Sequence, residues 1–71
     1  MQLKQLRIEA NLSQRELADA IGVYQGDICR YETGKLYPNI KTSMKFAKYF
    51  GITLDEFYKD ELENVGNNSG N

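Results

Sequence analysis

Two short helical patterns joined by a glycine constrain this chain more than any other feature, and they span residues 13–34. Ser13 and Glu16 form an S-x-x-E capping box, in which each side chain bonds the other residue's backbone at a helix start. Gly22 follows the first pattern directly and indicates a left-handed residue just past the helix end. A narrow apolar stripe lies between these two signals, formed by Leu17, Ala18 and Ile21.

The second pattern predicts a helix over residues 25–33 that has one apolar and one polar side. Ile28 and Tyr31 stand three residues apart and face inward, and the run Glu32-Thr33-Gly34 ends the helix. Such a helix is suited to being presented to a partner. Its outward positions are held by Gln25, Gly26, Asp27, Cys29 and Arg30.

The spacing of these features resembles the helix-turn-helix of the phage-repressor-like, Cro-type DNA-binding family. Small Ala18 stands where the two helices would cross, and Gly22 stands at the turn. The resemblance extends from about Leu3 to Tyr58 and implies an all-α, compact five-helix, lambda-repressor-like domain. The four main apolar positions of the motif are occupied by Leu17, Ile21, Val23 and Ile28.

Length and composition agree with one small domain. A chain of 71 residues buries only about 60% of its unfolded surface. With one cysteine and no histidine, it offers no internal disulfide and no plausible zinc site, so we expect no metal and no cofactor. No apolar run approaches the ~18 residues of a membrane span, and the N-terminus lacks a signal-peptide stretch. We therefore expect a cytoplasmic protein with no membrane partner.

The charge is distributed unevenly along the chain. Residues 1–59 hold nine basic and seven acidic residues, whereas residues 60–71 hold three acidic residues and no basic one. This predicts a mildly basic domain over 1–59 and an acidic, disordered tail over 60–71. The tail is either the natural terminus or a linker to a further domain. A local basic patch is compatible with DNA binding, although the net charge is −1.

Three more helices are expected around the motif. The first covers residues 2–10 and would bury Leu3, Leu6 and Ala10. The fourth covers residues 40–50, begins after the cap Asn39 and ends at Gly51. The fifth covers residues 54–59 and opens with a second capping box, Thr53 with Glu56. The fourth helix is expected to turn these residues to the core: Ile40, Met44, Phe46, Ala47 and Phe50.

The resemblance assigns an ion pair between Arg7 and Glu32, which ties the first helix to the end of the third. A direct phosphate contact by Arg7 is the alternative, and both are compatible. Gln14 is either a solvated polar residue or a backbone-phosphate contact that also braces Gln25. Ile8 is either a stray surface residue or part of an interface, and Cys29 is either a small filler or a redox-sensing thiol.

The outward face of residues 25–33 supplies the expected base contacts. Gln25 can bond an adenine edge, and Arg30 can bond guanine or neutralise a phosphate. Asp27 either accepts from a cytosine amino group or stabilises the helix N-terminus. Gly26 costs about 1 kcal/mol in a helix relative to alanine and allows a close approach to DNA.

The expected DNA-backbone contacts surround this face. Tyr24 is a weak N-cap but can place its hydroxyl on a phosphate. The segment over residues 34–39 runs along the DNA backbone in the family, and Lys35 would contribute charge. The full set of backbone contacts is Gln14, Tyr24, Lys35, Asn39 and Lys41.

The resemblance implies a sequence-specific regulator of transcription that binds double-stranded DNA as a homodimer on a palindromic operator, and we expect it to repress rather than to activate. Phe57, Tyr58 and Leu62 are the expected dimer-interface residues. A phage-type repressor, a restriction-modification controller and an antitoxin all fit this pattern. The alternative is a protein-interaction module that kept the fold and lost DNA affinity. An enzyme fits the sequence poorly, because there is no histidine, a single isolated cysteine and no phosphate-binding glycine loop. No catalytic residues are therefore expected.

Overall fold

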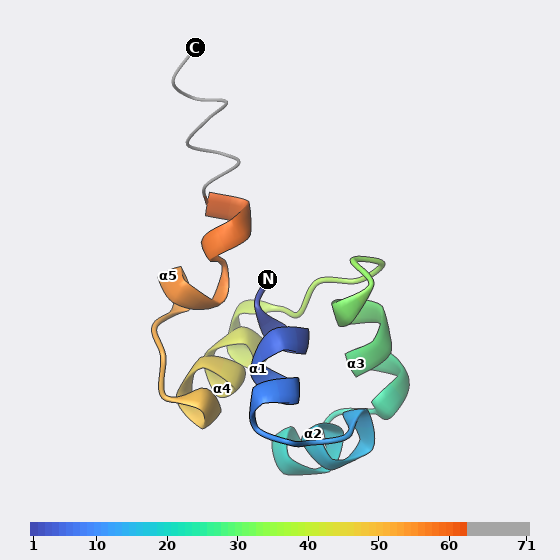
Figure 1. Cartoon of the computed structure of the whole chain (residues 1–71). Coiled ribbons are helices and arrows are strands. Elements are labelled where there is room, and N and C mark those ends of the chain that lie inside the picture. The colour runs from blue at the N-terminus through green and yellow to red at the C-terminus, as the bar shows by residue number, and fades with distance from the viewer. Residues whose placement is uncertain (63–71) are drawn as a thin grey trace.

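The computed structural model describes residues 1–62, and this part of the chain contains no strand. A helical turn over residues 59–62 adds a sixth helical segment to five helices. Figure 1 shows α1 at the centre, with α3 on one side and α4 and α5 on the other. The prediction of an all-α fold built on five helices is confirmed. The helices are α1 (Leu3–Glu9), α2 (Gln14–Ile21), α3 (Gln25–Glu32), α4 (Ile40–Phe50) and α5 (Leu54–Phe57).

Both ends of α2 have the predicted chemistry. The Ser13 hydroxyl accepts from the Glu16 N–H at 3.0 Å, and the Glu16 carboxylate accepts from the Ser13 N–H at 2.8 Å. Gly22 ends the helix with a φ of +88°, a left-handed conformation that favours glycine. Tyr24 then precedes α3 with an extended backbone and no side-chain capping bond. A well-capped helix thus leads through a tight turn into a weakly capped one.

The core lies where α1, α2, α3, α4 and α5 converge. The Phe46 ring stacks on Phe57, with 5.7 Å between centroids, and meets the edge of Tyr31 at 6.0 Å. These ring contacts join α3 to α4 and α5. The buried cluster consists of Leu3, Leu17, Ala18, Ile21, Ile28, Tyr31, Phe46 and Phe57.

The first helix is shorter than predicted. It ends at Glu9, and Asn11 takes a left-handed φ of +58° that turns the chain toward α2. Ala10 therefore lies on the surface, and its predicted place in the core is wrong. Leu3 is fully buried and Leu6 packs against the core, as expected.

The buried face of α4 also differs from the prediction. Ile40 and Met44 were expected in the core, but 66% and 56% of their surfaces are exposed. Ser43 is buried instead, and its hydroxyl lies 2.6 Å from that of Tyr58. The reason is geometric, because the buried stripe follows positions 43, 46, 47 and 50, whereas 40 and 44 lie on the adjacent face.

The N-terminus packs against the segment that follows α5. The Gln2 N–H donates to the Phe57 carbonyl at 2.9 Å, and the Gln2 amide donates to Asp60 at 2.8 Å. The amino group of Met1 forms an ion pair with Glu61. The predicted tail, 60–71, thus begins with residues of a helical turn, and residues 63–71 lie outside the described part. No helix within residues 1–62 is both long enough and apolar enough to cross a membrane.

Candidate nucleic-acid interface

The third helix presents a polar face on a rigid base. Ile28 is completely buried and Tyr31 is 8% exposed, so the inner side of α3 is fixed in the core. Gln25, Gly26 and Arg30 are exposed on the other side. A surface helix anchored in this way can enter a groove without losing its packing.

One ion pair organises the outer face of α3. Nη1 of Arg30 lies 3.2 Å from Oδ1 of Asp27, one turn earlier in the helix. The Asp27 side chain is 30% exposed and that of Arg30 is 57% exposed. This pair was not predicted, although opposite charges three residues apart on a helix are a usable signal. Cys29 is exposed on the same helix.

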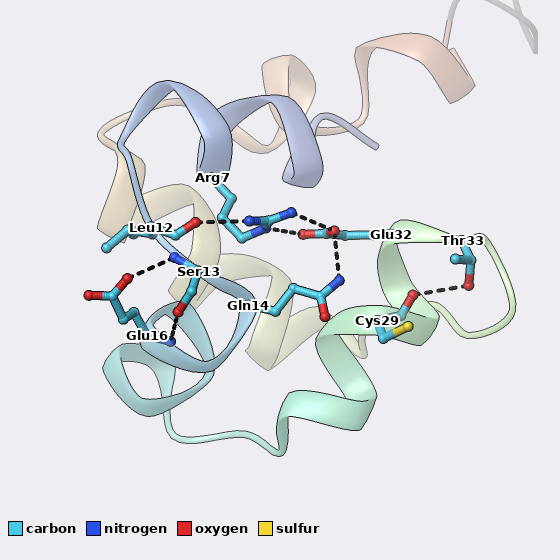
Figure 2. A network of polar contacts seen from close by, with 8 residues as sticks. All are labelled: Arg7, Leu12, Ser13, Gln14, Glu16, Cys29, Glu32 and Thr33. Carbon is cyan, nitrogen blue, oxygen red and sulfur yellow. Dashed lines mark hydrogen bonds and ion pairs between the residues drawn. The ribbon is translucent and has the colours of Figure 1, made fainter.

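The end of α3 is tied to α1 by the predicted ion pair between Arg7 and Glu32, which Figure 2 shows from close by. Nε and Nη2 of Arg7 donate to the two carboxylate oxygens at 2.6 and 3.1 Å. Nη1 donates to the Leu12 carbonyl at 2.8 Å. The hydrogen bond with Glu32 raises the pKa of Arg7 above its ordinary value, while desolvation opposes this shift. With 13% and 3% side-chain exposure, the pair is largely withdrawn from solvent.

Gln14 belongs to the same network. Its side-chain amide donates to Oε1 of Glu32 at 3.1 Å (Figure 2). The predicted bracing of Gln25 by Gln14 is therefore wrong, because the charged carboxylate of Glu32 is a stronger acceptor than a neutral amide. The network joins α1, α2 and α3 and fixes how α3 leaves the body of the domain.

The residues expected at the DNA backbone border this face. Tyr24 is 83% exposed directly before α3, and Lys35 and Lys41 are exposed after it. The loop between α3 and α4 is anchored by the Lys35 N–H, which donates to the Arg30 carbonyl at 2.9 Å. Asn39 caps α4, as predicted, by accepting from the Thr42 N–H at 2.9 Å.

The three residues expected at a dimer interface are in different environments. Phe57 has no exposed surface, so its side chain is not available to a partner. Tyr58 is half-buried, and its hydroxyl is engaged with Ser43. Leu62 is 49% exposed. Of this set, only Leu62 presents a largely free apolar surface.

A different group of apolar side chains is exposed, and we call it the exposed apolar cluster. It spans the α3–α4 loop and the first half of α4, where Ile40 and Met44 share one helix face. Its members are 41% to 66% exposed. For Ile40 and Met44 the sequence signal was present, since these two positions fall outside the stripe that Phe46 and Ala47 define. The members are Leu36, Tyr37, Ile40 and Met44.

Comparison with known proteins places this arrangement in a family. The sequence profile of the helix-turn-helix family matches residues 3–57. The cryptic phage CTXphi transcriptional repressor RstR of Vibrio cholerae is 35% identical over 63 residues, which are 89% of this chain and 57% of that protein. The HTH-type transcriptional activator BcrR of Enterococcus faecalis is 39% identical over 59 residues, 83% of this chain and 29% of that protein.

A third relative is an uncharacterised HTH-type transcriptional regulator of Methanocaldococcus jannaschii. It is 38% identical over 56 residues, 79% of this chain and 85% of that protein. No solved structure matches the chain. The chain spans little more than half of the phage repressor and under a third of the activator.

The profile match covers every helix from α1 to α5, and the structure joins α2 to α3 through the turn that the motif requires. The resemblance found in the sequence is therefore confirmed: the chain belongs to the helix-turn-helix family of DNA-binding transcriptional regulators.

Proposed function

We propose that this protein is a sequence-specific repressor of transcription that inserts α3 into the major groove of double-stranded DNA. The observation that carries the proposal is the polar face of α3. Gln25 and Arg30 are exposed on a helix whose opposite side is locked into the core. The ion pair between Arg7 and Glu32 holds the same helix from its far end. A rigid element with free polar side chains is what base recognition needs.

The reading face consists of Gln25, Gly26, Asp27 and Arg30. Gln25 suits the N6 and N7 positions of adenine, and Arg30 suits O6 and N7 of guanine. Gly26 has no side chain and lets the helix backbone approach the base edges. Each well-formed pair of hydrogen bonds to a base contributes about 1–3 kcal/mol of discrimination against a wrong base.

Backbone contacts would position this face in the groove. Lys35 is exposed in the loop that leaves α3 and Lys41 in the first turn of α4. The exposed Tyr24 side chain can place its hydroxyl on a phosphate before α3. Gln14 and Asn39 complete the proposed set through their amide groups. Contacts of this kind fix orientation and add affinity for any sequence.

The protein would act as a homodimer on a palindromic operator. Two copies on half-sites one helical turn apart have their third helices about 34 Å apart. The exposed apolar cluster and Leu62 support a second copy as the partner, because such side chains gain free energy when a neighbour removes them from water. The four-residue cluster is small against the ~800 Å² per partner of a stable interface. This supports a dimer that forms on DNA.

Repression is proposed because a small bound domain can block a promoter without further parts. The relatives include a protein named a repressor and one named an activator. A reporter gene behind the operator tests the sign. Expression that falls when the protein is produced supports repression, and expression that rises contradicts it.

The experiment that tests the main proposal is selection of bound duplexes from a random DNA library by the purified protein. Enrichment of an inverted repeat would support a dimeric operator reader. Binding should weaken steeply between about 50 and 200 mM salt, because several phosphates are neutralised. A folded protein that enriches no sequence would contradict the proposal and favour a protein-interaction module.

A further inference from the structure

Gly26 lies in the middle of the reading face, where its backbone gives no reason for a glycine. Of the four glycines that the structure describes, Gly22, Gly34 and Gly51 have positive φ angles and Gly26 does not. A glycine inside a helix is less favourable than alanine. Its place in α3 therefore calls for an explanation from its surroundings.

The explanation lies in the side chain of Arg30, one turn later. Helical side chains point back toward the helix N-terminus, so Arg30 lies over the turn that contains positions 26 and 27. A Cβ atom on Gly26 would stand 3.2 Å from Nη1 and 3.9 Å from Cζ of Arg30. The shorter distance is tighter than ordinary van der Waals contact, so a side chain at position 26 would require the guanidinium to shift by a few tenths of an ångström from its present place.

Asp27, the residue next to Gly26, also bonds this guanidinium. Its Oδ1 atom accepts from the same Nη1 at 3.2 Å. Arg30 has five N–H donors, so one bond to Asp27 leaves others for a partner, and 57% of the side chain stays exposed. The ion pair also offsets the cost of bringing a carboxylate near a polyanion, since Asp27 is already paired.

We infer that Gly26 and Asp27 form a seat that pre-orders the Arg30 guanidinium for contact with a guanine edge. This inference rests on the proposed function and refines it, because it makes Asp27 a positioning residue for Arg30, with no base of its own. Fixing one flexible side chain before binding is expected to strengthen the contact by about two- to tenfold.

The test compares Gly26→Ala, Asp27→Asn and Arg30→Ala on the selected operator and on duplexes substituted at each base pair. Gly26→Ala should raise Tm, because alanine favours the helix, and should lower operator affinity by about two- to tenfold. Gly26→Ala should lose discrimination at one base pair of the operator. This should be the same base pair at which Arg30→Ala loses discrimination. Combined with Arg30→Ala, the Gly26→Ala change should have no further effect on binding.

Asp27→Asn separates positioning from direct recognition. The inference predicts weaker discrimination at the Arg30 base pair, together with tighter binding to unrelated DNA because a negative charge is lost. Loss of discrimination at a different base pair would overturn the inference, because Asp27 would then read a base itself. Asp55→Asn on α5 removes the same charge away from α3 and serves as the control.

The order of the Arg30 side chain can also be measured in the protein without DNA. Its result does not depend on whether the protein binds an operator. In ¹⁵N relaxation, the Arg30 Nε–H group should be more ordered than that of exposed Arg15, and Gly26→Ala and Asp27→Asn should each remove the difference. Equal order in Arg30 and Arg15 of the unmodified protein would overturn the seat. A protein with an ordered Arg30 that selects no DNA would instead overturn the proposed function.

Discussion

At the scale of single residues, Glu32 joins three helices through its carboxylate. Its carboxylate accepts two hydrogen bonds from Arg7 and one from Gln14. Three helices thus meet at one largely buried side chain. The buried carboxylate is favourable only while these donors stay in place.

Glu32→Ala is therefore expected to lower the free energy of unfolding by about 3–5 kcal/mol, because Arg7 is left as a buried and uncompensated charge. Urea unfolding followed by circular dichroism measures the loss. Glu9→Ala is the matched control, since Glu9 is exposed and, within residues 1–62, accepts a single side-chain hydrogen bond, from Gln5 at 3.4 Å. Equal unfolding midpoints for the two variants would contradict the role given to Glu32.

Tyr31 makes the folding stability of the domain depend on pH in the alkaline range. Burial first, and then the charge of Asp27 and the neighbouring Tyr58, raises the pKa of Tyr31 above its ordinary value. The folded state thus favours the neutral phenol. This contribution is complete below the unfolded pKa of about 10 and is lost as the pH rises through the higher folded pKa.

Tyr31→Phe removes the phenol, so its stability should not fall with ionisation of residue 31. The stability of Tyr31→Phe minus that of the unmodified protein should therefore be greater above about pH 10 than at pH 7. Thermal unfolding across the alkaline range measures this. Tyr37→Phe is the control, because Tyr37 is 57% exposed and should leave the pH profile unchanged. A Tyr31→Phe profile parallel to that of the unmodified protein would refute the assignment.

Several residue-scale features could be predicted from the sequence, and the reason for each success or failure is physical. The pairing of Arg7 with Glu32 followed from the family pattern. The Gln14–Gln25 pair did not form, because the choice between two acceptors depends on distances that spacing does not give. The Asp27–Arg30 pair is local, within one turn, and so was accessible to sequence reasoning.

At the scale of helices, boundaries marked by capping chemistry were predicted well. Ser13, Asn39 and Thr53 all cap their helices, because such bonds involve neighbours in sequence. At Thr53 only one bond of the predicted capping box forms, in which its hydroxyl accepts from the Glu56 N–H. The face that a helix buries was harder to predict. For α4, the apolar residues Ile40 and Met44 lie outside, while Ser43 is accepted inside because Tyr58 gives its hydroxyl a partner.

The weak start of α3 offers a way to stabilise the domain. Tyr24 has the extended backbone of an N-cap, makes no capping bond and is 83% exposed. Tyr24→Ser should supply the missing acceptor and stabilise the fold by about 0.5–1 kcal/mol relative to Tyr24→Ala, which removes the same ring. Chemical denaturation of the two variants isolates the cap. Equal stability of Tyr24→Ser and Tyr24→Ala would contradict this, because it would mean that the N–H groups at the start of α3 already have partners.

At the scale of the whole molecule, the sequence predicted a helix-turn-helix domain but not which surface stays apolar. The helix patterns and the turn are local, and they determine the core around Leu17 and Phe46. Which surface stays exposed depends on the face that every helix buries, so it cannot be determined from one helix alone. The exposed apolar cluster was not recognised in the sequence, because Ile40 and Met44 were expected in the core.

The exposed apolar cluster gives the last prediction, which concerns assembly on DNA and rests on the proposed dimer. Met44→Gln keeps the length and helix propensity of the side chain but removes its apolar surface. Affinity for a duplex with two half-sites should fall, while affinity for a single half-site stays unchanged, because only the contact between copies weakens. Gel-shift titration of both duplexes measures this loss of cooperativity. Ile8→Gln on α1 is the control, since Ile8 is 53% exposed outside the cluster. Cooperativity that survives Met44→Gln but is lost in Ile8→Gln would place the contact between copies on α1 instead.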